Sequence, residues 1–174
     1  MIITVNELKQ QVDCGLDSDE LIAEKVEAIE AVIRAYTNNN FQQRAIRFAG
    51  QSSDRFVYGN PQHFAVGDTV QISESGGLND GIYSIVEVAQ NYIQLDKGLF
   101  DLEHNLVTKV AYPADVKQCC IDLYRWKQNM GVKVGIKSET LSRHSVTYED
   151  SATLFMGYPV GILNGLKLYK KARC

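Results

Sequence analysis

Residues that could carry out acid–base or metal chemistry are scattered along this sequence rather than grouped. The three histidines, His63, His104 and His144, lie far apart, and none forms an HxxxH or HxH pair. The cysteines form no CxxC pair, and none has a histidine at a zinc-like spacing; they are Cys14, Cys119, Cys120 and Cys174. We therefore expect reduced thiols, no bound metal and no cofactor.

Two further segments have the composition of binding loops without their spacing. The acidic residues Asp96, Asp101 and Glu103 lack the periodicity and the glycine position of a calcium-binding loop. The glycine-rich stretch 76–81 is followed by no Lys-Ser or Lys-Thr pair and opens no helix, so it predicts a hairpin turn. No serine stands in a GxSxG motif. The sequence predicts a protein that is not an enzyme.

The composition indicates a globular protein of modest charge. The 174 residues are 45% hydrophobic and carry a formal charge of −3, which does not indicate a nucleic-acid or membrane-surface partner. The first residues run into a polar helix signal without the pattern of a secretion signal. No window has the roughly 18 consecutive apolar residues of a membrane span. We expect a protein that is made and kept in a cytoplasm, with no membrane partner.

Hydrophobic periodicity predicts two long amphipathic helices. One spans residues 19–37, where apolar side chains recur three and four residues apart and the asparagine run 38–40 ends the pattern. The other spans residues 114–130, between a proline and a glycine. A shorter helix should follow the capping box near the N-terminus, over residues 5–12. We expect the two long helices to pack on each other.

Between the long helices the pattern changes to short apolar runs separated by turn residues. We interpret residues 44–110 as a β-rich insert that resembles an SH3-like barrel, and residues 1–43 and 111–174 as one helical domain. The interior of the barrel should be filled by Val70, Ile72, Ile82, Ile85, Val86, Ile93 and Leu95.

The C-terminal part predicts a hairpin and a last helix. Residues 134–136 and 145–148 are expected to be strands on either side of the polar run 137–144, which predicts a projecting β-hairpin. The last helix should span residues 158–173, and its apolar side docks either on its own domain or on a partner. The predicted fold class is α+β: a small helical bundle with an inserted small β-barrel-like domain and a projecting β-hairpin.

Three segments of the helical parts carry a family resemblance through their joint order. Residues 27–41 end in Tyr-Thr-Asn-Asn-Asn-Phe, and residues 137–148 contain Ser-Glu and end in Ser-Val-Thr-Tyr. Residues 158–171 contain Leu-x-x-Tyr-Lys-Lys. In these features the chain resembles the head–tail connector (adaptor, or head-completion) proteins of long-tailed bacteriophages. With its β insert it is similar to members from Gram-positive prophages.

The resemblance implies a virion structural protein that completes the head after DNA packaging. It implies a ring, usually twelvefold, at the head–tail junction, after assembly in the host cytoplasm. The implied partners are the portal protein, a tail-side connector or stopper protein, further copies of the chain, and the passing DNA, which would be contacted independently of sequence. The residues expected to bind partners are Lys137, Ser138, Glu139, Arg143, His144, Tyr158, Leu166, Tyr169, Lys170, Lys171 and Arg173.

A second class of function stays open, in which the barrel is a nucleic-acid- or peptide-binding module on a helical scaffold. Barrels that bind single-stranded nucleic acid combine aromatic and basic side chains. Between residues 59 and 112 only Lys97 and Lys109 are basic. This low basicity favours a structural or protein-contact role for the insert.

Overall fold

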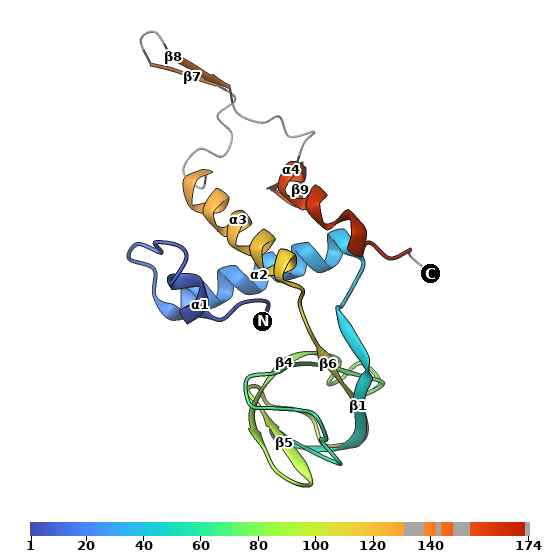
Figure 1. Ribbon diagram of the computed structural model, residues 1–174. Helices are drawn as coiled ribbons and strands as arrows, with labels where there is room; N and C mark the ends of the chain where they lie inside the picture. The colour runs from blue at the N-terminus through green and yellow to red at the C-terminus, as the bar shows by residue number, and fades with distance from the viewer. Residues whose placement is uncertain (131–137, 142–143, 148–153, 173–174) are drawn as a thin grey trace. The chain divides into compact units, whose positions relative to one another are not determined.

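The computed structural model describes residues 1–130, 138–141, 144–147 and 154–172. The chain is an α+β protein with two compact units, shown in Figure 1. The barrel unit comprises Met1 and Asn40–Tyr112, and the helical unit comprises Ile2–Asn39 and Pro113–Cys174. The helical unit is therefore assembled from the two chain segments that flank the barrel.

The barrel unit is a closed antiparallel barrel of six strands in the order β1-β2-β5-β4-β3-β6. β1 pairs with β2 and also with β6, which closes the barrel and leaves no unpaired edge among these strands. The strands are β1 (Gln42–Ser53), β2 (Phe56–Tyr58), β3 (Thr69–Ser73), β4 (Gly81–Val88), β5 (Tyr92–Leu95) and β6 (Leu102–Val110).

Alternating apolar side chains fill the interior of the barrel, as expected for half-buried strands. Two residues expected inside are not in this core. Val86 is 52% exposed because the pairing of β4 with β5 shifts register after Ile85, and Ile82 is only half-buried. The buried core consists of Phe48, Val57, Phe64, Val70, Ile72, Ile85, Ile93, Leu95 and Val107.

The glycine-rich stretch 76–81 connects β3 to β4, which pair as an antiparallel hairpin. A buried polar network holds this connection on the barrel. The side-chain nitrogen of Asn79 lies 3.0 Å from each of three acceptors, the Ser52 hydroxyl, the Phe100 carbonyl and the Asn105 amide oxygen. Buried amides are costly unless they are hydrogen-bonded, so this network specifies where the loop sits.

The helical unit contains both predicted long helices with the predicted bounds, α2 (Asp19–Thr37) and α3 (Ala114–Met130). α2 starts at Ser18, whose hydroxyl accepts from the Leu21 amide at 3.3 Å, and it ends at Asn38 in the left-handed region with φ 48°. α3 packs against α2 and against the C-terminal elements. The N-terminal helix α1 (Val5–Lys9) is shorter than the expected residues 5–12.

The continuous last helix expected over residues 158–173 is wrong. Tyr158–Pro159 form strand β10, which pairs with β9 (Leu154–Phe155). A single turn, α4 (Val160–Leu163), and a 3₁₀ helix, η2 (Asn164–Tyr169), follow. Glycines at 161 and 165 weaken an α-helix here, and a 3₁₀ helix repeats every three residues. That repeat places Leu163, Leu166 and Tyr169 on one side.

A two-stranded pair lies in the region of the expected hairpin, but its strand bounds differ from the predicted loop 137–144 and strand 145–148. β7 (Ser138–Leu141) pairs with β8 (His144–Thr147), and Ser138 lies opposite Thr147. Five residues of the run 137–144, which was predicted to be a polar loop, are therefore strand (138–141 and 144). Cross-strand pairing satisfies their backbone groups. The predicted first strand at 134–136 lies outside the described residues.

Candidate functional site

The side chains best suited to binding a metal are dispersed in the described part of the chain. Within it, no three His, Cys, Asp or Glu side chains lie close enough together to hold a metal ion. Cys14, Cys119 and Cys120 are buried and form no disulfide. Burial raises the pKa of the Cys119 and Cys120 thiols to about 12, because a thiolate loses its hydration there.

The raised pKa values predict unreactive thiols. Since thiolate is the nucleophile, native protein with Cys174→Ser should resist a disulfide reagent at about pH 8 and react only after denaturation. The neutral thiol is favoured in the folded state, so its contribution to stability is present below the ordinary pKa of 9.0 and is lost as pH rises towards about 12. Fast stoichiometric labelling of folded protein would contradict this prediction.

A network of polar contacts surrounds the end of α2 in the helical unit. Four consecutive residues, Tyr36, Thr37, Asn38 and Asn39, contact residues 164–172; we call the four residues the clamp and residues 164–172 the C-terminal segment. The Tyr36 hydroxyl donates to the Asn164 side chain at 3.0 Å. The Lys171 amide donates to the Thr37 carbonyl at 2.8 Å. These bonds join positions more than a hundred residues apart in sequence.

The two asparagine side chains complete the clamp. Asn38 donates to the carbonyls of Lys171 and Ala172 at 3.3 and 3.0 Å, and Asn39 donates to the Tyr169 carbonyl at 3.1 Å. Asn38 adopts a left-handed conformation that few residue types tolerate, and this conformation ends the helix. The asparagine run therefore has two roles, ending α2 and binding the C-terminal segment.

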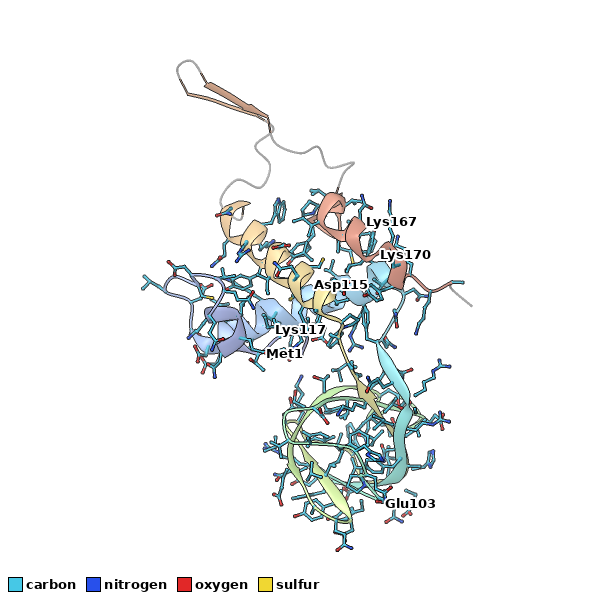
Figure 2. The ribbon with its side chains drawn as sticks, viewed as in Figure 1. Met1, Glu103, Asp115, Lys117, Lys167 and Lys170 are labelled. Atoms are coloured by element: carbon cyan, nitrogen blue, oxygen red, sulfur yellow. The ribbon has the colours of Figure 1, made fainter. Side chains whose placement is uncertain are left out.

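Asp115 of α3 and the ring of Tyr36 make further contacts with the C-terminal segment. The Tyr169 hydroxyl donates to the Asp115 carboxylate at 2.7 Å, and this bond raises the pKa of Tyr169. The Lys170 ammonium lies 3.8 Å from the centroid of the Tyr36 ring, a cation–π contact. Figure 2 labels Asp115 near the start of α3 and Lys167 and Lys170 on the C-terminal segment, all in the helical unit.

Of the residues expected to bind partners, several are occupied within their own unit. Tyr158 and Leu166 are 8% and 1% exposed, and the Tyr158 ring packs beside Trp126 with 5.9 Å between centroids. Tyr169 is bound to Asp115 as described. The apolar side of the segment thus docks on its own unit, one of the two alternatives that the sequence left open.

The remaining expected residues divide into two groups. Lys171 is exposed, and Lys170 is exposed apart from its contact with Tyr36. Ser138, Glu139 and His144 lie on β7 and β8, which form their own two-stranded sheet. Lys137, Arg143 and Arg173 lie outside the described residues. Sequence reasoning missed the side-chain roles of Asn38, Asn39 and Asp115; the asparagine run was a usable signal, but it predicted only the end of a helix.

We expect Asn38→Gly to release the end of the C-terminal segment while leaving α2 intact. Glycine keeps the left-handed backbone but removes two hydrogen bonds, each worth about 0.5–1.5 kcal/mol. Hydrogen exchange should rise at residues 169–172 and remain unchanged in α2. Asn40→Gly, at an exposed neighbouring position, is the matched control. Equal exchange in both variants would show that the asparagine does not hold the segment.

The barrel unit carries an aromatic cluster on its outer surface. Phe56, Tyr58 and Tyr92 lie on the paired strands β2 and β5, with ring centroids 5.4 to 6.3 Å apart. The Tyr92 hydroxyl donates to Glu87 at 2.8 Å. Residues 40–112 contain five basic and eight acidic residues, a formal charge of −3. The unit therefore combines a partly exposed aromatic cluster, in which Tyr58 is exposed and Phe56 and Tyr92 are half-buried, with acidic, not basic, character.

Comparisons with known proteins add no relative. A scan against models of protein families finds no match to this chain, and a search of curated protein sequences finds none. Among the described residues, no helix has the length and apolar character needed to cross a membrane.

Proposed function

We propose that this protein is a structural connector that forms a ring between the portal and the tail of a bacteriophage. The observation that carries the proposal is the clamp. Two of the three segments behind the resemblance, residues 27–41 and 158–171, bind each other through the side chains of Tyr36, Asn38 and Asn39. A shared motif order is more informative when its parts form one structural element than when they are scattered.

The finer architecture belongs to the same proposal. The helical unit acts as the connector-type bundle, the barrel is an SH3-like insert, and the hairpin of β7 and β8 projects towards a partner. The ring, usually twelvefold in this family, contacts the portal on one side and a tail-side connector or stopper protein on the other. The protein is made in the host cytoplasm and ends in the virion, where exposed lysines of the C-terminal segment contact passing DNA independently of sequence.

Ring formation on the portal is the direct test. The full chain is purified, mixed with the portal protein encoded in the same genome, and inspected by negative-stain electron microscopy and sedimentation. We expect annular assemblies with the portal, and rings of the chain alone at high concentration. The proposal would be contradicted if the chain stays monomeric under both conditions while its circular dichroism spectrum shows that it is folded.

Removal of residues 158–174 would be a poor test of partner binding. Truncation would remove Tyr158, Leu163 and Leu166, which are buried in the helical unit. Loss of assembly could then reflect unfolding rather than a lost contact. Substitutions of exposed side chains in the C-terminal segment separate these effects.

The aromatic cluster favours one second candidate, a barrel that binds a peptide or single-stranded nucleic acid. Exposed aromatic rings provide stacking surfaces for either ligand. The acidic charge of the unit argues against nucleic acid. Titration with a labelled oligothymidine at physiological salt should therefore show no binding. The candidate would be favoured if the chain binds the oligonucleotide, Tyr58→Ala abolishes the binding, and Val66→Ala, at another exposed position, does not.

A further inference from the structure

The helical unit has a strongly uneven distribution of charge along the chain. Its N-terminal part, residues 2–39, contains eight acidic and three basic residues. Its C-terminal part, residues 113–174, contains five acidic and ten basic residues. The two parts have opposite formal charges of −5 and +5. The unit has no net formal charge, but its charge is unevenly distributed along the chain.

The acidic charge includes a defined exposed patch at the start of α2, which we call the acidic end: Leu16, Glu20, Leu21 and Glu24. All four side chains are exposed, and Leu16 is fully so. Within the described residues, the carboxylates of Glu20 and Glu24 have no hydrogen-bond or ion-pair partner, whereas nearby Asp17 and Asp19 pair with lysines. Glu20, Leu21 and Glu24 lie within about one turn of α2, so the acidic end presents unpaired carboxylates next to an exposed leucine, with Leu16 in the loop that precedes the helix.

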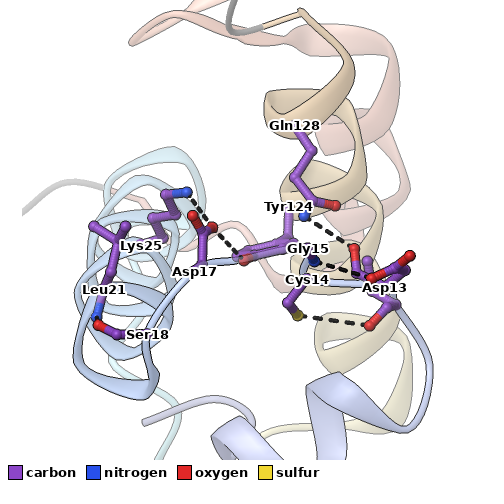
Figure 3. A network of polar contacts seen from close by, with 10 residues as sticks. Asp13, Cys14, Gly15, Asp17, Ser18, Leu21, Lys25, Tyr124 and Gln128 are labelled. Atoms are coloured by element: carbon purple, nitrogen blue, oxygen red, sulfur yellow. Dashed lines mark hydrogen bonds and ion pairs between the residues drawn. The ribbon is translucent and has the colours of Figure 1, made fainter.

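The loop that carries Leu16 is held in place, so the exposure of this side chain is built into the fold. Figure 3 shows the contacts: the Gln128 amide donates to the Asp13 carbonyl at 3.1 Å, and the Tyr124 hydroxyl lies 3.4 Å from the Asp17 carboxylate. Asp17 also pairs with Lys25 at 2.5 Å. Two side chains of α3 therefore fix both ends of the loop.

A complementary patch lies on the C-terminal segment, which we call the basic end: Lys167, Leu168 and Lys171. Leu168 is 91% exposed, and both lysines are exposed. The 3₁₀ repeat explains this arrangement, because Leu166 and Tyr169 face the unit and Leu168 is left outside. The ammonium groups of Lys167 and Lys171 have no partner within the described residues.

The acidic end and the basic end of one chain lie too far apart to bind each other. The clamp holds the basic end at the C-terminus of α2, through the Lys171 amide and the Thr37 carbonyl. Glu20 lies at the opposite end of the same helix, 17 residues earlier, which is about 25 Å at 1.5 Å per residue. One rigid helix therefore separates an acidic, leucine-bearing surface from a basic, leucine-bearing surface.

We propose that the acidic end of one copy binds the basic end of the next copy, head to tail. The charges are complementary, and the exposed leucines supply the apolar contact that charge pairs in water lack. An interface between two different surfaces is heterologous, and its repetition closes into a ring when the rotation permits. This inference rests on the proposed ring and assigns the residues of its subunit interface.

Charge reversal tests the pairing. The acidic-end variant is Glu20→Lys with Glu24→Lys, and the basic-end variant is Lys167→Glu with Lys171→Glu. We expect each to weaken self-association at least tenfold in sedimentation velocity, because like charges then face each other. The chain with all four substitutions should regain association. The control is Glu74→Lys with Glu103→Lys, on the exposed surface of the barrel unit. It changes the net charge by the same amount as the acidic-end variant and should leave self-association unchanged.

The outcomes separate this interface from the ring itself. Rings that form equally well from the wild type and both end variants would overturn the interface and leave the connector function standing. An end variant that is less stable in urea but assembles normally would also overturn it. The acidic side chains would then only stabilise α2 by their interaction with the helix dipole. A wild-type chain that stays monomeric at every concentration, with and without portal, would overturn both proposals.

Discussion

Replacing Leu123 by alanine should lower the free energy of unfolding of the helical unit by about 2–5 kcal/mol. Leu123 lies on α3, which packs against α2, and its side chain has no exposed surface. The truncation removes buried methyl groups and leaves a cavity that rigid neighbouring helices fill only in part. Urea unfolding followed by circular dichroism at the helical band measures the loss.

Leu16→Ala is the matched control, because it makes the same chemical change at a fully exposed position of the same unit. Its effect at low protein concentration should stay within about 0.5 kcal/mol. If the two variants unfold at the same urea concentration, the side chain of Leu123 is not part of the core of the helical unit. An unchanged slope of the transition with denaturant would show that both variants unfold as the wild type does.

Gly50→Ala should destabilise the barrel unit by about 3 kcal/mol, the upper part of the range for overpacking. A Cβ atom at this position of β1 would lie 1.8 Å from the Tyr58 carbonyl oxygen. Backbone cannot move aside as a flexible side chain can, so β1 and β2 would have to separate. Because β1 also pairs with β6, the distortion acts on the closure of the barrel.

Hydrogen exchange resolved by peptide is the measurement for this variant, because it distinguishes the two units of the chain. Protection should fall in β1, β2 and β6 and persist in α2 and α3. Gly98→Ala is the control, since a Cβ atom there meets no atom within 4 Å. If protection in the barrel is the same for both alanine variants, the close approach at Gly50 does not limit stability.

The long helices were predictable to the residue because their signals are local. Apolar spacing, the Ser18 cap and the asparagine run all act within a few residues of the helix they delimit. The presence of a barrel was predictable for a similar reason, from short strands and turn residues. The order of its strands was not, because the pairing of β1 with β6 joins strands that are far apart along the chain.

The C-terminal segment shows where local signals mislead. A hydrophobic pattern over residues 158–173 predicted one helix, but the apolar residues at 163, 166 and 169 recur every three residues rather than three and four. Pairing of Tyr158–Pro159 with β9 then occupied the expected first turn. The choice between α and 3₁₀ geometry depends on what the side chains pack against, which the segment alone does not contain.

The amino-acid sequence alone therefore determined the class of fold, the extent of α2 and α3, and the scattered arrangement of residues that could do chemistry. The clamp was decided by tertiary structure, since Tyr36 meets Asn164 across 128 residues and Asn39 meets Tyr169 across 130. The separation of the acidic and basic ends was decided in the same way. Local propensities act over a few residues, whereas such contacts exist only after packing has brought distant segments together and offset the entropy of closing the chain between them.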